Sequence, residues 1–272
     1  MKLEILYQDE NLVAINKPSG LLVHRSEIDR IETMFALQLL RNQLGQRVYP
    51  VHRLDKPTSG VLLFALNSET AGLMVEQWRQ RDVEKRYLAV TRGYMPEELH
   101  LDYPMVPPVD KYAKHERIKP AQEAITDFKL LATVEIDVEI DKYPQSRYSI
   151  VEVMPKTGRK HQIRRHLKHL SHPIIGDARY GKGRHSRYFR DHFDAGRLLL
   201  HAWQLSFDHP YSGDRINVYA GLDTPMKGLL ERFDWLTSLP SPLIQATAQE
   251  LVDEQCRELP ELPPEEEESL LP

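Results

Sequence analysis

The stretch HRLDKPTSG, residues 52–60, separates two apolar runs, RVYPV at 47–51 and GVLLFALN at 60–67. Pro57 and Gly60 interrupt regular structure, so the stretch predicts a loop. The run after it is apolar enough for a strand that is buried on both faces. Asp55 is therefore expected to be held between rigid strands while one side of its carboxylate stays open.

The chemistry of Asp55 follows from its neighbours in this loop. Arg53 and Lys56 flank it, and nearby cations favour the ionised form of a carboxylate. An ionised, positioned carboxylate can act as a nucleophile at a sugar carbon. The residues alone also allow a purely structural role, in which Asp55 caps the turn amides of Thr58 or Ser59.

Outward from this loop, strand and helix patterns alternate irregularly along the chain. We expect hairpins as well as crossovers, which favours a mixed α+β domain over a doubly wound one. The expected strands cover two runs around a turn at 8–11, then 60–67, 85–93, 125–155 with a break near 142–146, 198–210 and 214–221. The expected helices cover 31–45, 68–81 with Asn67 or Ser68 as its cap, 159–170 and 226–236, and the region 95–125 reads as loop.

Composition excludes several classes of protein. The chain of 272 residues contains no run of about 18 apolar residues, so no segment is expected to span a membrane. The first residues, MKLEILYQDENL, lack the basic start and apolar stretch of a signal peptide. The single Cys256 excludes an internal disulfide framework and a cysteine-based zinc site. These features favour a cytoplasmic protein with no membrane partner.

Charge is distributed unevenly along the chain. The net charge of −4 hides a tail, residues 251–272, with eight acidic residues and one arginine. Proline and consecutive glutamates predict that this tail is disordered. The expected organisation is therefore a domain over residues 1–240 followed by an acidic extension over 241–272.

The densest positive charge lies between Lys156 and Arg190, where eleven lysines and arginines accompany one acid, Asp177. Such a segment is typical of a nucleic-acid footprint.

Helical geometry distinguishes two arginines within this segment. Ile163, Leu167 and Leu170 form an apolar stripe, so Arg164 lies about 90–100° from its centre and Arg165 nearly opposite. Only Arg164 is expected to reach a buried site.

A metal site in the same segment is not expected. Four histidines, at 161, 166, 169 and 172, do not share one helical face, and no acidic side chain lies near them in the sequence.

The loop 52–60 resembles the catalytic loop of the RluA-type pseudouridine synthase family. Three further segments resemble that family in the same order along the chain. They are ENLVAINKPSGLLVH at 10–24, EKRYLAV at 84–90, and TGRKHQIRRHLKHLSHPIIGDARYG at 157–181 with RLLLHA at 197–202. The resemblance implies a mixed, mainly antiparallel sheet with flanking helices and a catalytic cleft.

The resemblance also implies roles for particular residues. Asp55 corresponds to the catalytic aspartate, Tyr87 to the tyrosine against the flipped base, and Arg164 to the arginine that pairs with the aspartate. Arg53 is expected to help displace or replace the base. We expect Lys56, Arg159, Lys160 and Arg165 to contact RNA phosphates as well.

Uridine isomerisation needs neither electron transfer nor a group donor, so no cofactor is expected. Because a duplex hides the glycosidic bond, the uridine must be extruded from its helix. The sequence of residues 52–78 most resembles that of family members that modify uridine 65 of tRNA. No obligate protein partner is expected.

Three other functions remain open at this stage. They are a ribosomal RNA synthase, a catalytically silent RNA-binding protein on the same fold, and a glycoside hydrolase. The last would need a second carboxylate as general acid, which the loop does not supply.

Overall fold

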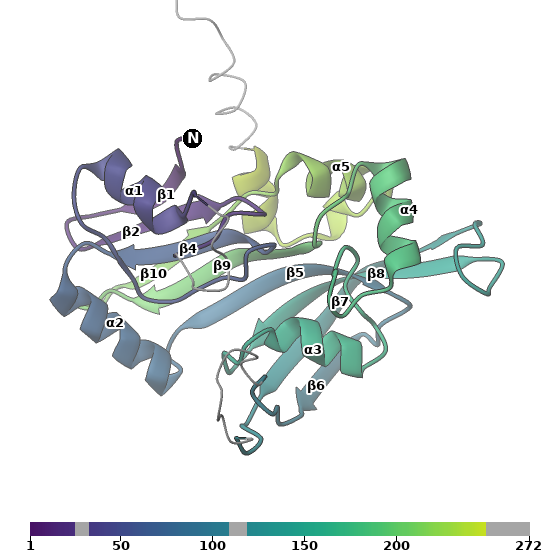
Figure 1. Ribbon diagram of the computed structural model, residues 1–272, viewed down its shortest axis with the longest axis horizontal. Coiled ribbons are helices and arrows are strands. Elements are labelled where there is room, and N and C mark those ends of the chain that lie inside the picture. The colour runs from purple at the N-terminus through teal and green to yellow at the C-terminus, as the bar shows by residue number, and fades with distance from the viewer. Residues whose placement is uncertain (25–32, 109–118, 249–272) are drawn as a thin grey trace, which may run out of the picture.

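The computed structural model describes residues 1–24, 33–108 and 119–248. Its centre is one twisted sheet in which neighbouring strands run in the order β1-β2-β4-β9-β5-β8-β7-β6, with β10 paired to β9 and β3 to β4 (Figure 1). The pairings are antiparallel except for β4 with β9. The strands are β1 Glu4–Gln8, β2 Leu12–Lys17, β3 Tyr49–Pro50, β4 Ser59–Ala65, β5 Glu84–Arg92, β6 Glu98–Asp102, β7 Ile125–Ile136, β8 Ser146–Pro155, β9 Leu200–Asp208 and β10 Arg215–Tyr219. The expected α+β class with a mainly antiparallel sheet is confirmed.

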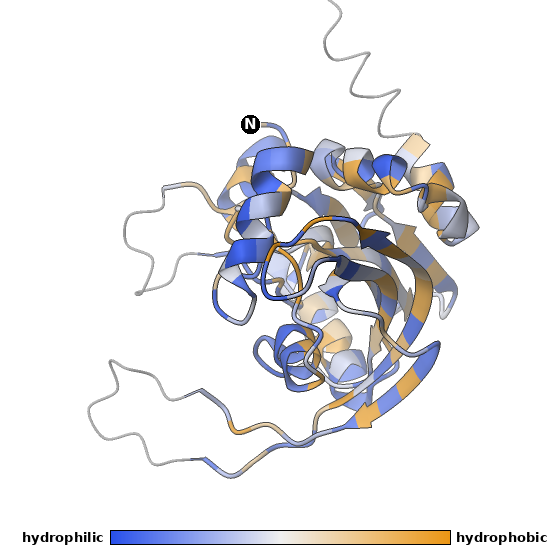
Figure 2. Cartoon of the chain, turned by 90° about the vertical axis from the view of Figure 1, so that its right-hand side faces the viewer, coloured by the Kyte–Doolittle hydropathy of each residue, from blue (hydrophilic) through white to orange (hydrophobic). Residues whose placement is uncertain are grey.

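The helices flank this sheet on several sides (Figure 1). They are α1 Ala36–Leu44, α2 Ser68–Gln80, α3 Gln162–His169, α4 Gly183–Phe193, α5 Thr224–Arg232 and the short 3₁₀ helix η1 Leu236–Ser238. The strands carry hydrophobic and hydrophilic segments in Figure 2; the outer strand β6 alternates exposed and half-buried positions, whereas the central strand β4 is buried throughout. Among the described residues, no helix combines the length and apolarity needed to cross a membrane.

The parallel contact between β4 and β9 fixes the end of the loop that carries Asp55, residues 52–60. Ser59 pairs with His201 and Gly60 with Ala202. Gly60 has φ +110°, and a Cβ atom there would lie 2.1 Å from the carbonyl oxygen of Ala202. Only glycine permits this approach, so Gly60 is required where the loop enters the centre of the sheet.

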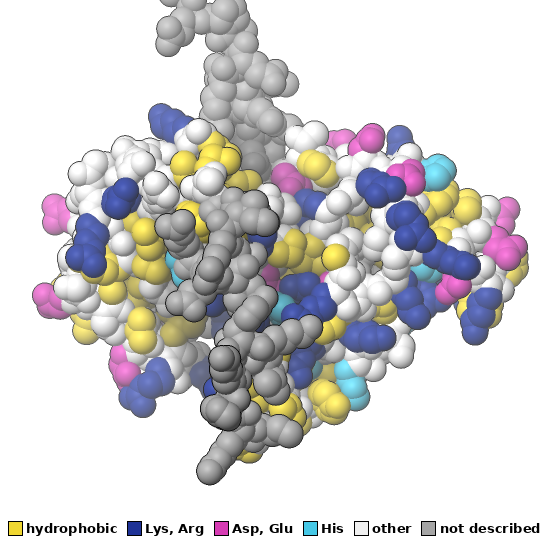
Figure 3. Space-filling model, viewed as in Figure 1, with side chains coloured by type: hydrophobic (Ala, Val, Ile, Leu, Met, Phe, Trp, Pro, Cys, Tyr) yellow, Lys and Arg dark blue, Asp and Glu magenta, His cyan; other side chains and the backbone are white. Residues whose placement is uncertain are grey.

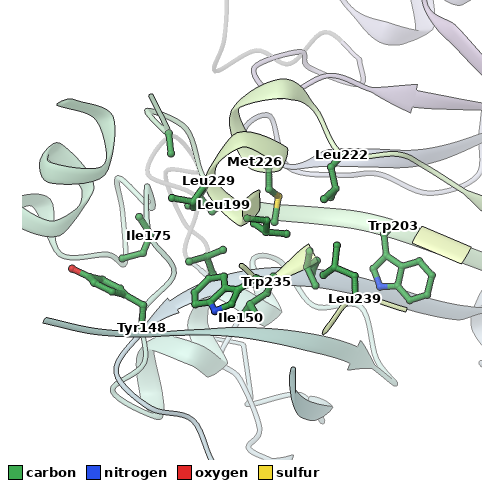
Figure 4. Close-up of a cluster of buried hydrophobic side chains, with 14 of the residues drawn as sticks. Tyr148, Ile150, Ile175, Leu199, Trp203, Leu222, Met226, Leu229, Trp235 and Leu239 are labelled. Atoms are coloured by element: carbon green, nitrogen blue, oxygen red, sulfur yellow. The ribbon is translucent and has the colours of Figure 1, made fainter. Parts of the chain in front are cut away.

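Apolar side chains fill both faces of the sheet. The cluster between β5, β8, β9 and helices α4 and α5 includes Tyr148, Ile150, Trp203, Met226 and Trp235, which form a row of buried side chains in Figure 4. A second cluster packs α1 against β2 and β4. The catalytic loop is thus joined to a strand, β4, that is buried along its whole length.

Several expected boundaries are wrong. The helix expected over 31–45 begins only at Ala36, because Phe35 is extended and bridges to Leu22; residues 31–32 lie outside the described part. Strand β6 and helix α4 were not expected, since β6 lies in the region read as loop and only His185 and Phe189 are buried in α4. The closing helix expected over 226–236 is Thr224–Arg232, capped by Asp223.

The expected boundary after residue 240 is also too early. Residues 241–248 are helical. Leu243 is fully buried in the cluster around Trp235, and the Thr247 hydroxyl accepts a hydrogen bond from the backbone of Leu222 at 3.1 Å. These residues pack with the domain. The remainder of the acidic tail, from 249, lies outside the described residues.

Candidate active site

The loop that carries Asp55 is fixed at its two ends by neutral histidines. The His52 Nε2 atom accepts the backbone N–H of Leu63 at 3.0 Å, and its ring stacks on Trp78. The Ser59 hydroxyl is 2.9 Å from Nδ1 of His201, whose Nε2 atom lies 3.1 Å from the carbonyl oxygen of Ala220. Burial lowers the pKa of His52 to about 3 and that of His201 to about 4. Both rings therefore serve as uncharged hydrogen-bonding struts.

A buried lysine fixes the middle of the same loop. The Lys17 ammonium donates to the carbonyl oxygens of Pro18, Leu21 and Lys56 at 2.8, 2.8 and 3.1 Å. Burial lowers the pKa of Lys17 to about 7. The segment 17–21 is thereby joined to the catalytic loop, which explains why two stretches far apart in sequence belong to one site.

Asp55 does not cap the turn with its side chain. The turn is closed by its backbone, whose carbonyl oxygen accepts the N–H of Thr58 at 3.0 Å. The carboxylate oxygen Oδ2 instead accepts a hydrogen bond from Nη1 of Arg164 at 2.8 Å. The Asp55 side chain keeps 23% of its surface exposed, so a substrate can reach it.

Arg164 bridges two carboxylates. Its Nε and Nη2 atoms donate to Asp177 at 2.8 and 2.9 Å, while Nη1 is bound to Asp55. Although burial opposes its charge, the hydrogen bonds with Asp177 and Asp55 raise the pKa of Arg164. Burial also opposes the charge of Asp177, but Arg164 and the backbone N–H groups of Tyr180 and Arg179 lower the pKa of that carboxyl group. The bidentate pair fixes the guanidinium group.

Helix α3 places Arg164 and Arg165 as its apolar stripe predicts. Ile163 and Leu167 are buried, and Arg164 points to Asp55 with 7% of its surface exposed. Arg165 lies on the outer side, where its Nη2 atom donates to the backbone oxygen of Val106 at 3.0 Å. The predicted difference in position between Arg164 and Arg165 is confirmed.

The start of α3 is fixed by Gln162. Its Oε1 atom accepts hydrogen bonds from the Thr157 hydroxyl and the Arg159 backbone, and its Nε2 atom donates to Ile125 and Thr126 on β7. Gly176 allows a close backbone approach directly before Asp177. Its φ is +79°, and a Cβ atom there would lie 1.8 Å from a backbone oxygen at Arg197.

Tyr87 lies on β5, where it pairs with Val153 of β8 and Ala202 of β9. Its side chain packs against two apolar clusters. One joins α1 to β2 and β4, and the other includes Val153 of β8 and Leu167 of α3. Burial, with a contribution from the charge of Asp55, raises the pKa of Tyr87. The phenol is therefore a protonated group beside the catalytic loop.

The other predicted RNA contacts lie around this centre. Arg53 and Lys160 are exposed, and Lys56 is half-buried. Arg159 donates through Nε to the backbone oxygen of Glu123 at 2.9 Å. Lysine and arginine side chains gather over α3 and α4 in Figure 3. The basic side chains of α4 and of the segment just before it are exposed: Arg179, Lys182, Arg184, Arg187 and Arg190. The structure thus places the basic segment on one face.

The four histidines of the basic segment have separate partners. His166 hydrogen-bonds to Thr126, His172 to the backbone of Arg92, and His161 to Tyr180, while His169 stacks on Tyr103. No group of three His, Cys, Asp or Glu side chains within the described ranges could hold a metal ion.

Sequence reasoning missed three groups at the site. They are Asp177, the structural Lys17 and His161, whose Nε2 atom lies 3.8 Å from Oδ1 of Asp55. The one usable signal was Asp177, the single acid in a basic segment. A cavity of about 390 Å³ lies elsewhere, beyond the end of α3, where Arg92, Asp141 and His185 are among its lining residues.

Comparisons with known proteins agree with this geometry. Residues 11–169 match the family model described as RNA pseudouridylate synthase. The chain is 50% identical over 247 residues to the "tRNA pseudouridine synthase C" of Vibrio vulnificus, which covers 90% of this chain and 99% of the relative. It is 52% identical over 237 residues to the protein of that name from Pasteurella multocida, with 86% and 98% covered.

A solved structure has the same fold. Human RNA pseudouridylate synthase domain containing 4 superposes with a TM-score of 0.65 at 27% identity, over 85% of this chain and 93% of the human chain. The family match covers more than half of the sequence and includes the loop of Asp55 and the arginine that holds it. The chain belongs to the RNA pseudouridylate synthase family.

Proposed function

We propose that this protein converts uridine 65 of tRNA to pseudouridine, with Asp55 as the nucleophile. The observation that carries the proposal is the carboxylate of Asp55, partly exposed and held by Arg164 at 2.8 Å. Identity of about 50% over nearly the full length of relatives named tRNA pseudouridine synthase C supports tRNA as the substrate. Tyr87 is proposed to lie against the extruded base.

The geometry suits the chemistry of this reaction. Isomerisation breaks the bond from N1 to C1′, turns the base and joins C5 to C1′. Attack by Asp55 at the sugar or at the base requires a carboxylate with one oxygen fixed and the other free. Arg164 occupies Oδ2, which leaves Oδ1 to approach the nucleotide.

A basic surface beside Asp55 supports RNA as the partner. Arg53 and Lys56 flank Asp55 in its loop, Arg159 and Lys160 directly precede α3, and Arg165 lies on that helix. Figure 3 shows lysine and arginine side chains over α3 and α4. Phosphate contacts of this kind position an RNA without reading its sequence. We propose that they hold the RNA while the target uridine leaves its stack.

The glycoside hydrolase alternative is disfavoured by Asp177. It is the carboxylate joined to Asp55 through Arg164, but its side chain is only 1% exposed and accepts two hydrogen bonds from that guanidinium. Its pKa is lowered, whereas a general acid needs a raised pKa. Asp177 therefore cannot protonate a leaving group.

The substrate is tested by mapping pseudouridines in total RNA from cells with and without the gene. Loss confined to position 65 of tRNA supports the proposal, and loss confined to ribosomal RNA refutes the substrate. The purified protein should modify a tRNA transcript but not the same transcript with cytidine at position 65.

The nucleophile is tested by Asp55→Asn, which keeps the size of the side chain. We expect no detectable pseudouridine and nearly unchanged tRNA affinity. Turnover by this variant, with deamidation excluded by mass spectrometry, would refute the assignment. A catalytically silent RNA-binding protein would show no activity in the wild-type chain either.

A further inference from the structure

His161 lies beside the proposed nucleophile without a part in the mechanism described so far. Its Nε2 atom is 3.8 Å from Oδ1 of Asp55, and its side chain is 14% exposed. It precedes α3 with φ +57° and ψ +29°. A non-glycine residue rarely adopts this left-handed conformation, and here it directs the imidazole toward Asp55.

The imidazole is held by the same network that holds Asp55. Its Nδ1 atom is 3.0 Å from the hydroxyl oxygen of Tyr180. The Tyr180 backbone donates to Asp177 at 3.0 Å, and the Arg164 guanidinium lies 5.3 Å from the Tyr180 ring centre. A chain of hydrogen bonds thus runs from Asp55 through Arg164, Asp177 and Tyr180 to His161. The imidazole is therefore fixed relative to the nucleophile.

The surroundings of His161 keep it uncharged. Burial lowers its pKa; Asp55 acts in the opposite direction, and Arg164, Arg179 and Lys160 lower it further. The net direction is downward from 6.5, so the ring is neutral near pH 7 and one of its nitrogens carries a lone pair. A neutral imidazole is a proton acceptor.

The reaction needs such an acceptor. Once C5 has joined C1′, C5 still carries its hydrogen. That proton must leave, so that the electron pair of its bond forms the C5–C6 double bond and the pair of the N1–C6 double bond returns to N1. N1 then takes up a proton. One proton moves from C5 to N1, and no other reactant is consumed.

The other charged or polar groups at the site are poor candidates for this step. Tyr87 has a raised pKa and keeps its proton. Arg164 is a cation, and Asp177 is shielded by it. Asp55 is bound to Arg164 through Oδ2, and its free oxygen Oδ1 already serves as the proposed nucleophile.

We propose that His161 takes the proton from C5 and returns it to N1, while Tyr180 fixes the ring. In this arrangement Nδ1–H donates to the Tyr180 oxygen, and the Nε2 lone pair faces the base. The distance of 3.8 Å between Nε2 and Asp55 is too long for a hydrogen bond, so Nε2 is available. This role rests on the proposed isomerisation of uridine.

The test compares His161→Asn with His169→Asn. Asparagine tolerates the left-handed backbone but accepts no proton at neutral pH. His169 is the last residue of α3, the helix that His161 precedes; it is exposed and stacks on Tyr103, so its variant is the matched control. Both are assayed by single-turnover kinetics, with saturating enzyme in excess over tRNA that carries hydrogen or deuterium at C5 of the uridine.

We expect His161→Asn to be slower by about 10²–10⁴-fold, the usual contribution of a general base. Deuterium should slow it further, because C5 deprotonation has become rate-limiting. His169→Asn should match wild type in both respects. Added imidazole should restore part of the activity of His161→Gly, since glycine also suits the positive φ and leaves space.

Two results would overturn the proposal. A His161→Asn enzyme at wild-type rate removes any role for the ring. A slow variant without a deuterium effect and without imidazole rescue makes His161 a positioning residue only. An inactive wild-type enzyme on tRNA would instead refute the proposed function, so the two failures are distinguishable. Thermal unfolding of each variant verifies that it is folded.

Discussion

Replacing Arg164 or Arg165 by alanine removes the same chemical group from adjacent positions of α3. Arg164 is buried and bound to two carboxylates at 2.8–2.9 Å. Arg165 makes one hydrogen bond, to a backbone oxygen at 3.0 Å. The structure therefore predicts very different losses from two substitutions that composition cannot distinguish.

The loss for Arg164→Ala has two parts. The side chain of Asp177 is 1% exposed and would lose the cation that balances its charge, keeping only the backbone N–H groups of Arg179 and Tyr180. Breaking a buried ion pair costs about 3–5 kcal/mol of stability. Asp55 would lose the group that fixes its orientation. Misplacement of a reacting group by about 1 Å costs about 10²-fold in rate, and loss of one positioned donor costs about 10²–10³-fold. We therefore expect a rate at least 10²–10³-fold lower.

The loss for Arg165→Ala should be small. An exposed hydrogen bond contributes about 0.5–1.5 kcal/mol, and a phosphate contact acts on binding. At saturating RNA we expect a rate within about fivefold of wild type. The assay is single-turnover pseudouridine formation at a temperature where urea unfolding shows both variants to be folded.

The opposite order of activities would refute the assigned phase of α3 and the pairing of Arg164 with Asp55. A rate of Arg164→Ala within tenfold of wild type would show that Asp55 is positioned without the guanidinium. The variant Arg164→Lys separates the effect of the positive charge from that of the guanidinium geometry. Lysine keeps the charge but cannot reach Asp177 with two nitrogens and Asp55 with a third, so it should remain strongly impaired.

Three further outcomes are expected. Asp177→Asn should lower the free energy of unfolding by about 3–5 kcal/mol and reduce the rate at saturating RNA at least tenfold, although Asp177 is buried behind Arg164; an unchanged rate would contradict its positioning role. His52 and His201 have folded pKa values below 6.5, so their stabilisation is complete above pH 6.5 and is lost as pH falls toward 4. Each should cost about 2 kcal/mol between pH 7 and pH 5 in urea titrations, and a constant free energy of unfolding would exclude the neutral struts. The affinity for tRNA should fall with salt by a logarithmic slope of about −0.7 to −0.9 per phosphate contacted, and a flat plot would remove the basic face as the RNA surface.

Local patterns were sufficient for much of the fold. The run 60–67 largely coincides with β4, and Asn67 caps α2 by accepting a hydrogen bond from the backbone N–H of Thr70. The apolar stripe of α3 sets the direction of Arg164. Each of these features depends on residues within a few positions of one another. Sequence periodicity contains that information directly.

Helix α4 and strand β6 were missed for identifiable reasons. Within α4 the buried positions are His185 and Phe189. The helix therefore lacks the aliphatic stripe from which a helix is predicted. Strand β6 alternates half-buried and exposed positions but lies among prolines, and it is stabilised by its pairing with β7, about 25 residues away. Tertiary pairing decided both elements, and single-sequence patterns do not report it.

The same limit explains which site residues could be foreseen. Asp55 and Arg164 are 109 positions apart, and no spacing rule joins them. Asp177 looked like a stray acid among cations, and Lys17 like an ordinary loop lysine. A buried charge pair or a buried ammonium is visible only when the chain brings its partners together.

The segments that carry the family resemblance are those that meet at Asp55. Each supplies a group that binds the loop of Asp55, lies beside that loop or positions Arg164. These groups are Lys17 from 10–24, Tyr87 from 84–90, His161, Arg164 and Asp177 from 157–181, and His201 from 197–202. The stretches between the segments include β7 and α2. Strand β7 pairs with β8 and accepts a hydrogen bond from Gln162 at the start of α3, and α2 packs against β3 and β4. A nucleophile with one oxygen fixed and the other open requires simultaneous contacts from distant parts of the chain. Four ordered segments are therefore what a single positioned carboxylate requires of this sequence.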